Sequence, residues 1–321
     1  MALSAVTKLD YPIGIGGDGG RGRFAAHFFP AVGARNRVLQ VLVHGVSYDH
    51  RYWNADTING EDYSYAAYMT AQGFDILAID LPGVGASDKP NGHDISLHAV
   101  GSAISGMVAL LKEHDAIPGF TFDHVSLIGH SMGASISVYS QARWPSADSV
   151  VVTATGFYPG RPKSAWAPGA REKLLSDPYP IVQPEARLKF YYRPQADPEV
   201  ISYDNDLLRC PTPSGLWADC IPLQDDPNAG FAELKCPVLI QLGEHDPILP
   251  AKFAEDERSL YSSSSRVSME PLADIGHSFN LHLNREKSWE GISQFLLGLA
   301  SHSKAEHSDS APSDSALEHR A

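Results

Sequence analysis

The sequence predicts an α/β protein built around a mostly parallel β-sheet. Between Tyr11 and Gly156, short β-branched or apolar runs alternate with longer helical patterns, which is the signature of βαβ units. The runs are almost continuously apolar, as strands buried on both faces are. No uninterrupted apolar stretch approaches the roughly 20 residues of a membrane span. With 43% hydrophobic and 20% charged residues, the chain has the composition of a soluble globular protein.

The first elements follow from the pattern in chain order. The glycine-rich GIGGDGGRG and the segment FAAHFFP indicate an opening hairpin. The runs RVLQVLVHG, FDILAIDLP, HVSLIGHS and SVVVTATG predict four successive buried strands with helices between them. After Ser96, apolar residues recur at helical spacing and predict one amphipathic helix, through Leu97, Val100, Ile104, Met107, Val108 and Leu111.

The pattern changes between residues 157 and 235. This stretch holds 12 of the 23 prolines and shows no strand alternation, so it predicts an insertion of short, broken helices. Strand character returns at PVLIQLGEHD, followed by a helical pattern from Pro250, the run SRVSMEPLA and a final helix through KSWEGISQFLLGLA. We therefore expect one core in two parts, residues 1–156 and 236–300, with the insertion between them and a polar, disordered tail at 301–321.

Charge and cysteine content exclude several classes of function. Acidic residues number 38 and basic ones 25, and the net charge of -13 would repel a phosphate backbone, so no nucleic-acid partner is expected. Cys210, Cys220 and Cys236 have no metal-ligand spacing, so no metal is predicted. Cys210 and Cys220 could pair in an oxidising compartment, but two free thiols are favoured. The start of the sequence lacks the features of a secretory signal, which favours the cytoplasm, with a secreted, processed protein as the alternative.

A nucleophile motif lies at a predicted strand-to-helix junction. Residues 129–133 read Gly-His-Ser-Met-Gly, which fits G-x-S-x-G, and Ser131 would occupy a sharp, strained turn. Side chains two positions before or after it would collide with the neighbouring strand and helix, which favours Gly129 and Gly133. Ser135 and Ser137 do not have a glycine on both sides in this way, and we interpret them as ordinary helical serines. An N-cap role is the alternative for Ser131, and the motif's context favours the nucleophile.

A serine hydroxyl needs a base that a carboxylate orients. In the chain order Ser, acid, His, the stretch VLIQLGEHDPIL offers Glu244 and Asp246 at the end of a late strand. Asp246 is favoured, because Glu244 sits nearer the strand, where a carboxylate bonded to nearby backbone is the simpler interpretation. The stretch LADIGHSFN places His277 in the loop before the final helix, where the base is expected.

When a serine attacks a carbonyl group, the carbonyl oxygen becomes an oxyanion, which needs hydrogen bonds from backbone N–H donors. Met132 N–H is one candidate, and Val46 N–H, in the loop after VLVHG, is the other. Gly45 permits close approach of that loop, and His44 is expected to brace it rather than act in catalysis.

The motifs HGVS, DLPGVGASD, GHSMG, GEHDPIL and GHSFN, in this order and context, resemble the α/β-hydrolase superfamily over nearly the whole chain to about Ala300. The resemblance implies an eight-stranded, mostly parallel sheet, a Ser-Asp-His triad and a cap after the sixth strand, here residues 157–235, that covers the pocket and sets substrate choice. HGVS in place of a glycine triplet is similar to the branch whose oxyanion donor is the residue after His-Gly, which supports Val46. Epoxide hydrolases and haloalkane dehalogenases of this fold use an aspartate nucleophile, so Ser131 disfavours them.

These observations predict a cofactor-free serine hydrolase that acts on a carboxylic ester or lactone of a small to medium apolar molecule. Carbon–carbon, amide or thioester hydrolysis, perhydrolysis and a receptor with little turnover stay alternatives. No membrane or protein partner is indicated, and a monomer and a homodimer are both open. Candidate substrate contacts, each with core packing as the alternative, are Gly45, Tyr48, Trp53, Met132, Phe157, Tyr158, Trp166, Tyr191, Tyr192 and Phe279.

Overall fold

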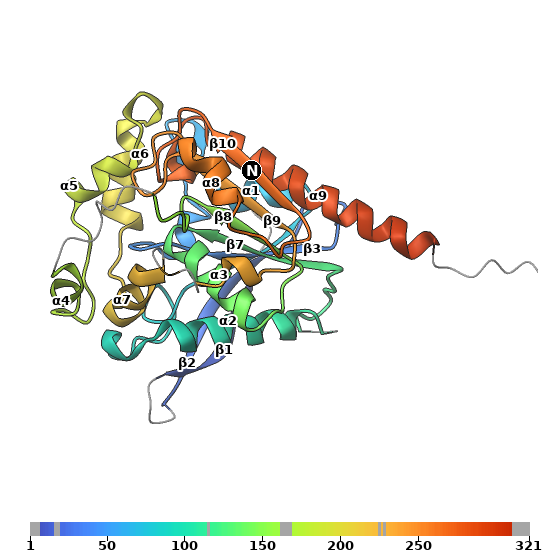
Figure 1. Ribbon diagram of the computed structural model, residues 1–321, viewed down its shortest axis with the longest axis horizontal. Helices are drawn as coiled ribbons and strands as arrows, with labels where there is room; N and C mark the ends of the chain where they lie inside the picture. The colour runs from blue at the N-terminus through green and yellow to red at the C-terminus, as the bar shows by residue number, and fades with distance from the viewer. Residues whose placement is uncertain are drawn as a thin grey trace, which may run out of the picture.

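The computed structural model describes residues 7–15, 20–113, 116–160, 169–223, 226 and 229–309 (Figure 1). Its centre is an eight-stranded sheet in the order β1-β2-β6-β3-β7-β8-β9-β10. Only β2 runs against its neighbours, and the other pairs between β6 and β10 are parallel, so the predicted mostly parallel sheet is confirmed. The strands are β1 (Thr7–Ile15), β2 (Gly20–Phe29), β3 (Val38–Val43), β6 (Asp75–Ile79), β7 (His124–His130), β8 (Ser149–Thr153), β9 (Val238–Gly243) and β10 (Val267–Leu272).

The structure contains two kinds of small element that the sequence pattern did not predict. A two-stranded ribbon, β4 (Thr57–Ile58) with β5 (Glu61–Asp62), lies outside the main sheet and is too short to show any alternation of polar and apolar residues. Single helical turns also occur, at η1 (His50–Tyr52), η2 (Gly92–Asp94), η3 (Leu188–Phe190), η4 (Arg193–Gln195), η5 (Asp204–Leu208), η6 (Phe231–Glu233), η7 (Ala251–Phe253) and η8 (Phe279–Leu281).

Helices cover both faces of the sheet because alternate residues of each strand point to opposite faces. In β3, Leu39 and Val41 pack in one apolar cluster with α2 (Leu97–Leu111) and α3 (Met132–Arg143). Val38 and Leu42 pack in a second cluster with α1 (Tyr65–Ala71) and α9 (Glu286–Asp309). The central strands β3, β6, β8 and β9 are buried along their whole length, as their apolar runs predicted. Figure 1 shows the sheet between these helical layers.

The insertion, residues 157–235, lies between β8 and β9. Its described helices are short: α4 (Ala170–Leu174), α5 (Pro184–Arg187), α6 (Pro198–Tyr203) and α7 (Ser214–Leu223). Pro184 and Pro198 stand in the first turns of α5 and α6, where the missing N–H costs no hydrogen bond, so the prolines divide this segment into brief helices. In Figure 1 these helices gather at one end of the sheet.

After the insertion, α8 (Ala254–Arg258) precedes β10, and α9 closes the chain's core. The final helix runs on to Asp309, past Ala300, where the sequence predicted a tail to begin; residues 310–321 lie outside the described residues. In the described part of the chain, no helix combines the length and the apolar character needed to cross a bilayer.

Candidate active site

Ser131 lies between the last residue of β7 and the first of α3, at φ 54° and ψ -120°. A non-glycine residue in this region is strained and has to be held by its surroundings. A Cβ on Gly129 would meet the backbone of Ala134 in α3, and a Cβ on Gly133 would meet the Val43 carbonyl oxygen at the end of β3. Both glycines are therefore required by close packing. The Ser131 side chain makes no capping bond to α3, so the N-cap alternative is not what the structure shows.

Three side chains from distant parts of the chain form a hydrogen-bonded series. The Ser131 Oγ lies 2.9 Å from Nε2 of His277, and Nδ1 of His277 lies 3.0 and 2.9 Å from the two carboxylate oxygens of Asp246. Because a carboxylate can only accept, Nδ1 carries the proton and Nε2 is free to accept the serine proton. Asp246 and His277 are buried, with exposed fractions of 1% and 5%.

Backbone contacts hold the acid and the base in place. The Asp246 Oδ1 also accepts the N–H of Ile248 at 2.7 Å, which fixes the carboxylate. The N–H groups of His277 and Ser278 both donate to the carbonyl oxygen of Phe190, at 2.7 and 3.1 Å. Since Phe190 belongs to η3 of the insertion, the insertion helps to set the position of the histidine loop.

The neighbouring carboxylate, Glu244, does not join the series. Its side chain is exposed, and its Oε2 accepts the N–H of Asp274 at 3.1 Å. This is the backbone-bonded role that the sequence favoured for Glu244. The structure therefore brings together Asp246, and not Glu244, with His277 and Ser131.

The loop after β3 passes close to Ser131 because it carries a glycine. A Cβ on Gly45 would lie 3.0 Å from both the His130 carbonyl oxygen and the Ser131 Cβ. His44 braces this loop: its Nδ1 donates to the Gly45 carbonyl oxygen at 2.9 Å, and its Nε2 accepts the Leu81 N–H at 3.1 Å. Burial lowers the pKa of His44, which keeps the ring in this neutral form.

A cavity of about 500 Å³ opens beside the Ser131 side chain. Its core-side lining is Val46, Ser47, Tyr48, His130, Ser131, Met132, Ser135, Ile248 and His277. Its insertion-side lining is Lys173, Val182, Ala186, Arg187, Lys189, Phe190, Trp217, Cys220 and Ile221. Val46 and Met132, the two candidate oxyanion donors, therefore lie at the same cavity as the serine. The volume is in the range of small-molecule sites.

Most of the aromatic substrate contacts predicted from the sequence do not line this cavity. Tyr48 and Met132 do. Gly45 lies beneath it against Ser131, and Trp166 lies outside the described residues. The remaining aromatics pack elsewhere: Trp53 on Tyr65, Phe157 on Phe231, Tyr158 on Phe253, Tyr192 on His245, Phe279 near His130, and Tyr191 with its hydroxyl on Asp204. For these six residues, the prediction of pocket lining was wrong because an apolar ring near a motif is equally able to fill a core.

The sequence missed a buried ion pair in the insertion. Arg187, which is 2% exposed, donates from Nη2 to Oδ1 of Asp204 at 2.5 Å. The hydroxyls of Tyr48 and Tyr191 both lie on Oδ2 of the same carboxylate. The Arg187 guanidinium also lies over the Tyr48 ring, 4.8 Å from its centre. No periodic or spacing signal joins Arg187 to Asp204 in the sequence, because a proline-containing stretch of irregular structure separates them.

Within the described ranges, two groups of side chains have the composition of a metal site. His27, His50 and Asp80 bring ligand atoms within 4.8 Å of one another, and so do Glu244, His245 and Asp274. In the first group the rings of His27 and His50 stack 3.5 Å apart, and both bond to the Asp80 carboxylate. Although burial would raise it, these two hydrogen bonds hold the pKa of Asp80 well below its usual range. The group thereby braces the loop after β6 as a hydrogen-bonded cluster.

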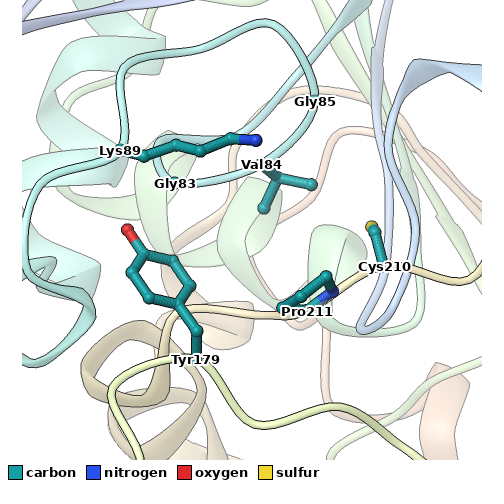
Figure 2. A pocket seen from close by; sticks show the side chains of 7 residues that line it. All are labelled: Gly83, Val84, Gly85, Lys89, Tyr179, Cys210 and Pro211. Carbon is teal, nitrogen blue, oxygen red and sulfur yellow. The ribbon is translucent and has the colours of Figure 1, made fainter.

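A smaller cavity of about 140 Å³ lies apart from the serine (Figure 2). Figure 2 shows Lys89 and Tyr179 at one side of it and Cys210 with Pro211 at the other. Burial raises the pKa of the Cys210 thiol to about 12, so the thiol stays protonated and is a weak nucleophile. Cys210, Cys220 and Cys236 are all free thiols, the alternative that the sequence favoured for the first two.

Comparison with known protein families agrees with this geometry. The family described as serine aminopeptidase, S33, matches residues 58–278. The AB hydrolase superfamily protein YisY of Bacillus subtilis is 27% identical over 237 residues, which cover 71% of this chain and 83% of that protein.

Solved structures share the fold at low identity. A thermophilic esterase from Thermogutta terrifontis superposes with a TM-score of 0.62 at 19% identity, covering 91% of this chain and 99% of its own. A soluble variant of monoglyceride lipase from Saccharomyces cerevisiae gives a TM-score of 0.67 at 15% identity, covering 89% and 94%. The sheet and its helices are therefore of the same kind as in these proteins.

Proposed function

Because the chain belongs to the α/β-hydrolase superfamily, we propose that it is a serine hydrolase that cleaves carboxylic esters or lactones. The observation that carries the proposal is the series from Ser131 through His277 to Asp246, with 2.9 Å at the serine and 2.9–3.0 Å at the carboxylate. A strained serine, a neutral imidazole with its lone pair on that serine, and a buried carboxylate are the parts that acyl transfer needs.

In the proposed reaction, Ser131 Oγ attacks the ester carbonyl carbon while His277 Nε2 takes the hydroxyl proton. Asp246 stabilises the imidazolium that forms. The ester C–O bond then breaks, and His277 returns the proton to the leaving alcohol. Water, deprotonated by His277, attacks the acyl-enzyme and releases the acid and Ser131. The N–H groups of Val46 and Met132 are proposed to bind the oxyanion, each lowering the activation barrier by about 3 to 4 kcal/mol.

The insertion, residues 157–235, is proposed to act as a cap that selects the substrate. Half of the residues that line the cavity beside Ser131 belong to it. Its η3 turn also bonds to the loop that carries His277. A cavity of about 500 Å³ suits a small or medium molecule rather than a polymer.

The charges around the cavity favour an ester over a peptide substrate. An aminopeptidase has to bind the ammonium group at the start of a peptide, which requires an anionic or acceptor group nearby. In the described part of the chain, no aspartate or glutamate lines this cavity, whereas Lys173, Arg187 and Lys189 do. Asp204 offsets the charge of Arg187, and the two exposed lysines would repel a peptide's ammonium group.

Replacement of the nucleophile tests the function. Ser131→Ala should lower kcat/KM on nitrophenyl esters by about 10⁴-fold or more and abolish labelling by a fluorophosphonate, because Ser131 Oγ is the only oxygen of the described residues that bonds to His277 Nε2. Ser135→Ala is the matched control, since Ser135 lines the same cavity one helical turn away, and it should keep both properties. Full esterase activity in a folded Ser131→Ala protein would reject the proposal, and labelling of Ser131 without turnover of any ester would favour a receptor.

A further inference from the structure

The insertion-side wall of the cavity is basic, although the protein as a whole is acidic. Lys173, Arg187 and Lys189 line it, and within the described residues no carboxylate side chain does. Lys173 and Lys189 are exposed, and neither forms an ion pair with a described residue. In a chain with a net charge of -13, a basic wall facing the nucleophile points to a ligand of opposite charge.

Arg187 is built into this wall and is not a loose surface side chain. Its Nη2 bonds to Asp204, which is fully buried and does not itself line the cavity. Tyr48 and Tyr191 hold the second oxygen of Asp204, so the carboxylate fixes the guanidinium from behind. The arginine is thus oriented before any ligand arrives, which lowers the entropy cost of binding.

Donor capacity remains on the cavity-lining residues. The Nε of Arg187 is buried and donates to no described residue, and the Oγ of Ser47 on the core side is also buried without a partner. Ser47 is held at φ 64°, a strained conformation for a serine. A buried donor without an acceptor is unfavourable, so a small shift of the side chain that brings a ligand oxygen to Nε of Arg187 would be favoured.

We propose that Arg187, Lys173 and Lys189 form an anion subsite, and that the ester substrate carries a carboxylate. This inference rests on the proposed ester hydrolysis at Ser131. The planar fork of a guanidinium matches the two oxygens of a carboxylate, and the exposed lysines attract the charge from solution. The ester carbonyl lies at Ser131 while the carboxylate lies against the insertion, so one molecule spans the cavity.

The first test compares esters that differ only in the charge. In the first pair, monomethyl adipate carries a carboxylate on the acyl side of the ester, and dimethyl adipate does not. In the second pair, the acetate ester of ω-hydroxyhexanoic acid carries a carboxylate on the alcohol side, and the methyl ester of that compound does not. In at least one pair, the carboxylate member should have a kcat/KM about tenfold or more higher. Added salt should reduce this preference, because the two exposed lysines are screened.

The second test removes the charges while the fold is kept. The double variant Lys173→Gln/Lys189→Gln should lower kcat/KM for the carboxylate ester several-fold, mainly through KM, and change kcat/KM for the neutral ester much less. Lys252→Gln, which removes an exposed lysine that does not line the cavity, should change neither. Arg187→Lys keeps a charge for Asp204 but loses the planar fork, and it should raise KM more for the carboxylate ester than for the neutral ester.

The outcomes separate the two proposals. Ser131-dependent turnover with no preference for the carboxylate in either pair overturns the anion subsite and leaves the ester hydrolase standing. If Arg187→Lys does not fold, the lysine variant and the salt dependence still decide. Ester turnover that does not depend on Ser131, or none at all, overturns the proposed function itself.

Discussion

At the scale of single residues, the site depends on two glycines, because there is no room for a side chain at either position. Ser131 keeps an unfavourable backbone conformation because β7, α3 and the end of β3 close around it. Gly129 and Gly133 have no side chain at the two points where these elements come closest. The strain at Ser131 and the tight packing beside it are therefore parts of one arrangement.

A methyl group at Gly133 should disturb that arrangement. In Gly133→Ala, the new Cβ would meet the carbonyl oxygens of Val43 and His44, and backbone atoms cannot rotate away from it. We expect about 100-fold lower kcat/KM and a free energy of unfolding lower by about 1–3 kcal/mol. Gly106→Ala in α2 is the control, because nothing lies near that position and alanine should slightly stabilise the helix. A wild-type rate in Gly133→Ala would show that the turn can relax.

At the scale of elements, one histidine ties the catalytic loop to the insertion. His282 follows η8, and its Nε2 accepts the N–H of Gly276 at 3.1 Å and the N–H of Tyr192 at 3.0 Å. Its Nδ1 donates to the Ser278 carbonyl oxygen at 2.8 Å. The residues on both sides of His277 are thus held by one neutral imidazole, which also fixes the insertion.

This arrangement predicts a dependence of stability on pH. Burial lowers the pKa of His282 to about 4, from 6.5 in an unfolded chain. Below pH 6.5 the unfolded state binds the proton more readily, so stability should fall as the pH drops from about 6.5 to about 4, by at most about 3 kcal/mol. Urea unfolding should show His282→Gln to be less stable at pH 7 but less sensitive to acid over this range. If His282→Gln and wild type lost stability equally on acidification, His282 would not be the cause of the pH dependence. The control is His98→Gln, at an exposed histidine, which should behave as wild type.

The order of the elements was readable from the sequence, and the walls of the pocket were not. Buried strands such as β3 and β9 are almost wholly apolar, and the motif around Ser131 has a fixed geometry, so local patterns identify them. Asp246 and His277 follow from chain order at strand ends. By contrast, the difference between Phe157 in the core and Phe190 at the cavity depends on how the insertion folds back. The folded insertion brings together residues that are far apart in an irregular segment, and the periodicity of the sequence does not reveal such contacts.

At the scale of the whole molecule, the insertion has to be joined firmly to a core that it interrupts. Glu257 in α8, after the insertion, makes such a connection to the segment before it. It is fully buried, and its Oε2 accepts the N–H groups of Phe157 and Tyr158 at 2.7 and 2.8 Å. Its Oε1 accepts the Tyr261 hydroxyl at 3.2 Å. The carboxylate therefore fixes the point at which the chain leaves the sheet.

Removal of this carboxylate should loosen the start of the insertion. Glu257→Ala leaves the buried N–H of Phe157 and the half-buried N–H of Tyr158 without their acceptor, so we expect the free energy of unfolding to fall by about 2–4 kcal/mol. Glu257→Gln should lose less, because an amide oxygen can still accept one of the two bonds. Exposed Glu255→Ala on the same helix is the control for a lost charge. If urea unfolding gave Glu257→Ala the stability of Glu255→Ala, the insertion would have to be anchored by its other contacts, chiefly Phe190 and His282.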